Sequence, residues 1–134
     1  MKSLKKIKAF NLQELLVVLV IIGILILLVL PNLMPLIARA KSIEAQSQLK
    51  YIYTQEKTYF YMYSTYSNDF NKIDFIAPKT VKDNGKANYN YKIIASTNNS
   101  FKARATSVTD FDGDGVFNVW EIDQDQNLLE VVKD

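Results

Sequence analysis

The feature that most constrains this chain is a long apolar run near its amino terminus. The run extends from Leu15 to Leu30 without a charge, and continuing it to Ile37 gives 23 positions of which only Asn32 is polar. In an α-helix this length would reach about 35 Å, because each residue adds about 1.5 Å, and that is enough to cross a bilayer. The sequence therefore predicts a membrane-spanning helix.

The residues ahead of the run are basic. Four lysines and no acid lie within the first nine residues. By the positive-inside rule, this bias keeps Met1 in the cytoplasm and sends everything after Ile37 outward. Most of the chain is therefore expected to form one small extracytoplasmic domain.

Two ordinary segments share this pattern, namely a secretory signal peptide and an uncleaved membrane anchor. The run is longer than a typical signal core, and no small-x-small cleavage box follows it directly. Neither alternative accounts for Glu14, a carboxylate at the mouth of the run, because a charge in an apolar span costs about 2.5–3.5 kcal/mol on insertion scales. Its position about one turn from the edge would also let it point toward the headgroups.

The leader and the apolar run together fit a known pattern, carried by Phe10, Glu14, Gly23, Pro31 and Arg39. At these intervals the segment resembles the amino-terminal region of type IV pilins and type II secretion pseudopilins. The resemblance implies that a prepilin peptidase cuts between Ala9 and Phe10, that the new amine of Phe10 is methylated, and that the apolar helix stays on the mature subunit. Ala9 stands where the family has Gly.

The resemblance also implies a location, partners and a role for Glu14. It describes a single-pass protein of the bacterial inner membrane that passes into an extracytoplasmic filament at the cell surface, built by a pilus or type II secretion assembly platform. In that homo-oligomeric filament the family pairs the Phe10 ammonium, with a reference pKa of about 7.7–8.0, with the glutamate of an adjacent subunit. An ion pair at 4 Å and an effective dielectric near 20 is worth about 4 kcal/mol, comparable to the insertion cost.

These inferences divide the chain into a leader (1–9), a transmembrane and assembly helix (10–37) and a pilin-like globular domain (38–134). Without the leader's four lysines, the 16 basic residues fall to 12 against 14 acids, so nothing implies a nucleic-acid surface. There is no cysteine to form a disulfide. The chain also lacks His and a Gly-rich phosphate loop, so we expect no enzyme.

The globular part predicts an α+β fold, with a long helix packed on a small antiparallel sheet. An apolar stripe with helical spacing continues the helix to about Tyr63, although Pro31 and Pro35 predict a bend or an unwound stretch. Turn-forming residues fill 64–85, and alternating patterns then predict a hairpin at 89–93 and 101–105. Two further strands are expected near 119–122 and 128–132. This outline resembles pilin headgroups.

The second informative motif is acidic and lies near the carboxy terminus. Its residue types and spacing match the calcium loop of the EF-hand, with a glycine, Gly115, at the turn. The candidate Ca²⁺ ligands are Asp110, Asp112, Asp114, the carbonyl of Val116, Asn118 and Glu121. Because the flanking segments predict strands, we expect a structural calcium site that takes the place of a disulfide. The alternative is an acidic Gly-rich turn that binds nothing.

Two classes of function fit these observations. A filament subunit, either a type IV pilin or a type II secretion pseudopilin, accounts for Phe10, Glu14, the retained helix and the calcium loop together. A monomeric membrane-tethered calcium-binding or adhesive domain accounts for the anchor and the loop but leaves Glu14 unexplained.

Overall fold

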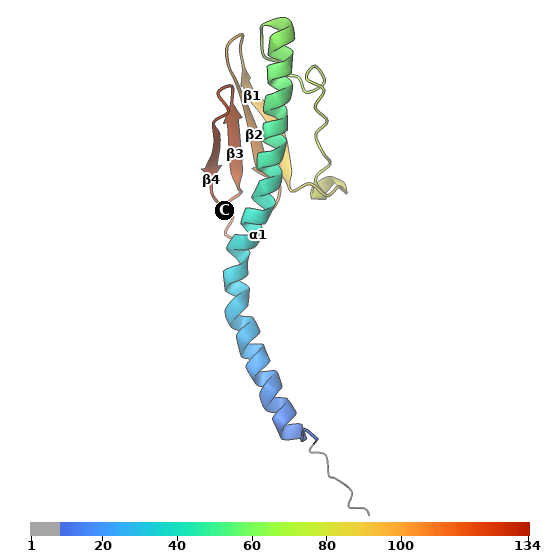
Figure 1. Ribbon diagram of the computed structural model, residues 1–134, viewed down its shortest axis with the longest axis vertical. Coiled ribbons are helices and arrows are strands. Elements are labelled where there is room, and N and C mark those ends of the chain that lie inside the picture. The colour runs from blue at the N-terminus through green and yellow to red at the C-terminus, as the bar shows by residue number, and fades with distance from the viewer. Residues whose placement is uncertain (1–8) are drawn as a thin grey trace, which may run out of the picture. The chain divides into compact units, whose positions relative to one another are not determined.

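The computed structural model describes residues 9–134, apart from the side chain of Asn32 (Figure 1). A long helix is followed by a short 3-10 helix and four strands: α1 (Leu12–Tyr63), η1 (Val81–Asp83), β1 (Tyr89–Ser96), β2 (Phe101–Ser107), β3 (Val119–Asp123) and β4 (Leu128–Val132). The chain forms two compact units, which divide between Met34 and Pro35. The predicted α+β fold, a long amino-terminal helix followed by an antiparallel sheet, is confirmed.

The first unit is the apolar half of α1. Residues Leu12–Pro31 are long and apolar enough to cross a membrane, and none of this stretch is buried within the subunit. Helical structure continues through Pro31 and Pro35, so the unwound stretch expected from these prolines is not found. Each proline lacks only its own N–H donor, and the flanking residues keep the helical conformation on both sides.

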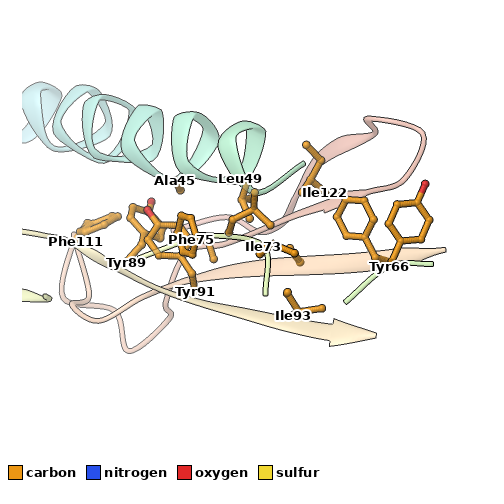
Figure 2. Close-up of a cluster of buried hydrophobic side chains, with 14 residues drawn as sticks. Ala45, Leu49, Tyr66, Ile73, Phe75, Tyr89, Tyr91, Ile93, Phe111 and Ile122 are labelled. Carbon is orange, nitrogen blue, oxygen red and sulfur yellow. The ribbon is translucent and has the colours of Figure 1, made fainter. Parts of the chain in front are cut away.

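In the second unit the sheet has the strand order β1-β2-β3-β4, with every neighbouring pair antiparallel. Alternate residues of β1 and β2 are buried, as a sheet with one covered face requires. The cover is the second half of α1, from which Ala45, Leu49 and Ile52 enter the core with no exposed area (Figure 2). The sheet contributes mainly Tyr89, Tyr91, Ile93, Phe101, Ala103, Ala105 and Ile122.

The segment between α1 and β1 closes one side of this core. Phe70 and Phe75 pack with ring centroids 4.8 Å apart, and Ile73 and Phe75 are buried. The sequence did not predict η1 within this segment. Its three residues are too few to show a periodic pattern, and none of them is buried.

Candidate functional site

The first candidate site is the start of α1. The backbone N–H of Glu14 donates to Asn11 Oδ1 at 2.9 Å, so Asn11 caps the helix. An Asn followed three positions later by Glu is a helix-start signal, so the sequence itself contains the pattern of this cap. Glu14 is therefore held in the first turn, and its side chain is exposed.

Within the described part of the chain, no cation lies within ion-pair distance of Glu14. Phe10, just before the helix, exposes 82% of its surface. The predicted leader 1–9 lies outside the described residues except for Ala9. Among residues 9–134, the start of α1 thus offers one carboxylate without a cationic partner, beside an apolar helix surface that the chain itself does not cover.

The second candidate site is a cluster of four aspartates, formed by Asp110, Asp112, Asp114 and Asp134. One carboxylate oxygen of each lies within 4.8 Å of the others. Gly113 and Gly115 have φ values of +84° and +88°, a left-handed conformation that bends the loop around the carboxylates. Three of the six predicted ligands, all from the first half of the motif, are therefore brought together.

Backbone N–H groups hold the first aspartate in place. Asp110 accepts hydrogen bonds from Gly115 and from Gly113, and the Gly115 bond is the main reason that the pKa of Asp110 is lowered. For Asp112 the bond from the Asp114 N–H acts to lower the pKa, yet desolvation and the nearby charges of Asp114, Asp134 and Asp110 outweigh it, so the pKa is raised. The carboxylates therefore repel one another.

Asp134 is the member of the cluster that the sequence did not predict. Its Oδ2 accepts a hydrogen bond from the Phe111 N–H at 2.9 Å, and its Oδ1 is buried without a hydrogen-bond partner among the described residues. No local spacing could have identified it, because the β3–β4 hairpin brings it back from the end of the chain to the loop.

Asn118 does not lie in the cluster, contrary to the expectation from the EF-hand register. Its side chain is 3% exposed and forms a buried network: Oδ1 accepts from the Tyr89 hydroxyl at 2.5 Å, and Nδ2 donates to Glu130 at 2.7 Å and to the Val132 carbonyl at 2.9 Å. Because β3 follows directly, strand alternation turns this side chain toward α1 and away from the loop.

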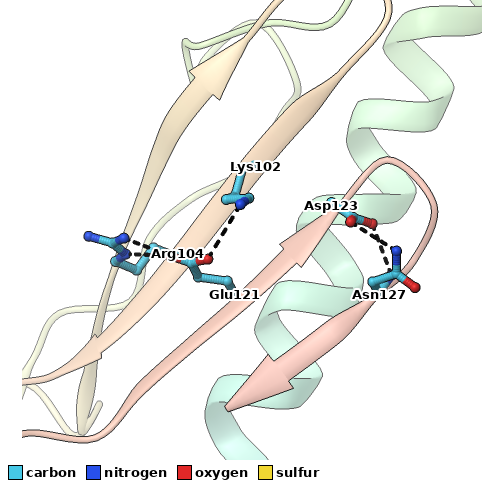
Figure 3. A network of polar contacts seen from close by, with 5 residues as sticks. All are labelled: Lys102, Arg104, Glu121, Asp123 and Asn127. Carbon is cyan, nitrogen blue, oxygen red and sulfur yellow. Dashed lines mark hydrogen bonds and ion pairs between the residues drawn. The ribbon is translucent and has the colours of Figure 1, made fainter. Parts of the chain in front are cut away.

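Glu121 also lies elsewhere. In β3 it pairs across the sheet with Arg104, whose Nη2 is 2.6 Å from Glu121 Oε1, and with Lys102 at 3.8 Å (Figure 3). In an EF-hand the last ligand is carried by a helix, whereas here an extended strand carries Glu121 away from the loop. Val116 donates a hydrogen bond from its backbone N–H to Asp114 Oδ1 at 2.7 Å.

A second acidic segment, residues 123–127, forms the turn between β3 and β4. Asp123 accepts hydrogen bonds from the N–H groups of Asp125 and Asn127 and from the Asn127 side chain (Figure 3). These bonds stabilise the hairpin that returns β4 to β3.

Comparison with known proteins shows a similarity to a type IV pilin. No family model matches the chain. It is 37% identical over 89 residues, 66% of its length, to the type IV major pilin protein PilA of Myxococcus xanthus (strain DK1622). The chain spans 38% of that relative's length. The chain is thus similar in sequence to a type IV major pilin, and its apolar amino-terminal helix and α+β fold agree with that similarity.

Proposed function

We propose that this chain is the structural subunit of a type IV pilus-like filament, assembled through its amino-terminal helix. The observation that carries the proposal is the uncovered apolar surface of Leu12–Pro31, of which the subunit buries none. A bilayer can cover such a surface before assembly. In a filament outside the membrane, only the helices of neighbouring copies can cover it. Its role is then structural and not catalytic.

Glu14 supplies the specificity of this packing. Its carboxylate stands at the start of the helix without a cation from the described residues. Cleavage by a prepilin peptidase between Ala9 and Phe10 would free the α-amine of Phe10, which remains a cation after a methyl donor methylates it in a separate step. The ammonium of one copy would neutralise Glu14 of another. Because an unpaired charge among apolar helices is costly, the register that pairs the charges is favoured. The subunit would await assembly in the bacterial inner membrane, with its leader in the cytoplasm.

Calcium would stabilise the globular domain. The fit rests on the four aspartates, because Ca²⁺ prefers oxygen ligands at about 2.3–2.6 Å, so two ligands of one ion are at most about 5 Å apart. The oxygens of Asp110, Asp112, Asp114 and Asp134 satisfy this limit at 4.8 Å. The mutual repulsion of their charges favours a cation, as does the Oδ1 of Asp134, which has no hydrogen-bond partner within residues 9–134. Binding there would tie the loop to the end of the chain.

The proposal is tested on the chain expressed in a piliated bacterium whose own major pilin is deleted. We expect surface filaments by electron microscopy, and mass spectrometry of sheared filaments should find N-methylated Phe10 at the amino terminus. A subunit that keeps Met1 and never leaves the membrane fraction would instead support the monomeric tether.

A further inference from the structure

A groove of about 530 Å³ lies within the second unit, between α1 and the β3–β4 end of the sheet. Its walls come from two sources. The helix contributes Arg39, Ser42 and Gln46, and the sheet contributes Trp120, Glu130 and Lys133. Asp134 also lines it. The groove is large enough to hold an aromatic side chain.

The chemistry of the groove favours an aromatic guest with a hydroxyl group. Trp120 offers an aromatic wall, and its buried indole N–H has no acceptor among the described residues. Arg39 and Lys133 are exposed cations that form no ion pair within the part of the chain that the structure describes. Cations attract the face of an aromatic ring, and a phenolic oxygen can accept from an indole N–H.

The opposite end of the same unit presents such a group. Tyr61 is 82% exposed, and its neighbours Met62 and Tyr63 are 64% and 61% exposed. These residues form the last turn of α1, which lies beside the β1–β2 turn (Figure 1). The two are joined by a hydrogen bond that Thr65 Oγ1, just after the helix, donates to Asn98 Oδ1 in the turn. The helix from Pro35 to Tyr63 covers about 42 Å, so groove and tyrosines lie far apart on one subunit.

We propose that the groove receives Tyr61 of a second copy of this chain. The contact rests on the proposed filament function and adds a specific head-to-tail contact between globular domains. Two different surfaces at opposite ends of one subunit form a heterologous contact, which repeats into an open helical filament where its rotation does not close a ring. Tyr61 would stack between Arg39 and Lys133 and cover Trp120.

An anionic lipid headgroup is the competing guest, since Arg39 and Lys133 are cationic. The groove also presents the carboxylates of Glu130 and Asp134, which would face a lipid phosphate at close range. Like charges at such distances repel. A neutral aromatic side chain avoids this repulsion, so a second copy is the better fit.

Cysteine cross-linking tests the contact, because the chain has no native cysteine. Met62→Cys and Gln46→Cys, combined in one chain, leave Tyr61 and both cations in place. Treatment of intact filaments with a short bismaleimide should give a ladder of covalent oligomers. The matched control combines Ile76→Cys, at a site 90% exposed, with Gln46→Cys and should stay monomeric. Filaments without a ladder, or an equal ladder in the control, would overturn the contact alone.

The single tryptophan provides a second measurement that needs no cysteine. Quenching of Trp120 fluorescence by acrylamide should fall several-fold on going from detergent-dispersed subunits to filaments, and Tyr61→Ala should remove this protection. Protection that persists in Tyr61→Ala filaments, or that appears when dispersed subunits meet phosphatidylglycerol vesicles, would contradict the contact and favour lipid. If the wild-type chain forms no filaments at all, the proposed function fails and the contact fails with it.

Discussion

The fully buried carboxylate of Glu56 accepts a hydrogen bond from the backbone N–H of Ser67 at 3.0 Å, which joins the carboxy-terminal part of α1 to the segment that follows the helix. The other oxygen, Oε1, is buried without a partner among the described residues. Burial raises the pKa of Glu56 to about 7, and the Ser67 hydrogen bond only partly opposes this effect. When Glu56 is ionised, its negative charge is therefore buried with little compensation from hydrogen bonds, which destabilises the folded state.

Stability should therefore fall as the pH rises. In the folded chain Glu56 holds its proton up to pH about 7, whereas an unfolded glutamate loses it near its usual pKa of 4.5, so the folded state binds more protons between these values. The stabilisation is complete below pH 4.5 and is lost by about pH 7, a change on the order of 3 kcal/mol. Chemical denaturation of detergent-solubilised chain across this range measures it.

Glu56→Gln is the matched variant, because it keeps an acceptor for the Ser67 N–H and cannot ionise. We expect it to flatten the pH dependence between 4.5 and 7 and to raise the free energy of unfolding at pH 8 by about 1–3 kcal/mol. A variant whose profile still follows that of the wild type would show that Glu56 does not titrate as described.

Glu14→Gln should separate membrane insertion from assembly. The substitution removes the charge and keeps the shape, so the apolar helix should insert as well as in the wild type. Filament yield should drop at least tenfold, because the ammonium of a neighbouring copy would then lie unpaired among apolar helices. Membrane fractionation and the quantity of sheared filaments measure the two steps. Gln13→Ala, one position earlier, is the control, and a normal yield from Glu14→Gln would refute the pairing.

Calcium should raise the stability of the wild-type chain. With a dissociation constant of about 10⁻⁴ to 10⁻³ M, as in extracellular modules, about 5 mM Ca²⁺ should add about 1–2 kcal/mol to the free energy of unfolding. Asp112→Asn combined with Asp134→Asn should abolish this gain, and protease resistance in Ca²⁺ should fall with it.

Glu121→Gln is the control that separates the observed cluster from the EF-hand register. Its carboxylate pairs with Arg104, so the variant should lose a little stability but keep its full response to Ca²⁺. If Glu121→Gln loses the response and the double aspartate variant keeps it, the cluster is not the binding site.

Asn118→Ala should destabilise the chain without affecting calcium. The change leaves the Tyr89 hydroxyl and the Val132 carbonyl without their partner, and stranded buried groups cost about 1–3 kcal/mol each. Thermal unfolding with and without Ca²⁺ should show a lower midpoint and an unchanged calcium shift. If the variant lost the calcium-induced shift but kept the wild-type unfolding midpoint, Asn118 would be a calcium ligand after all.

The elements of this fold could be predicted closely from the sequence. The helix ends at Tyr63 as expected, and the four strands lie near their predicted positions, although β1 and β2 extend to Ser96 and Ser107. The extensions came late in each pattern, where Ala, Ser and Thr give little contrast between buried and exposed positions. The helix continued through Pro31 and Pro35 because the cost of one proline is small against many retained hydrogen bonds.

The candidate site was predictable only in part, because some of its contacts join residues that are far apart in the sequence. The apolar run, the acid at its mouth and the Asp-x-Asp spacing are local patterns, since residues a few positions apart in a helix or loop are necessarily close. Strand pairing decided the rest. The register of β2 with β3 gave Glu121 to Arg104, strand alternation buried Asn118 beside Tyr89, and the β3–β4 hairpin carried Asp134 to the loop. Residue pairs that form by strand pairing cannot be inferred from the spacing of residues that are neighbours in the sequence, because the tertiary structure decides which strands meet and in which register.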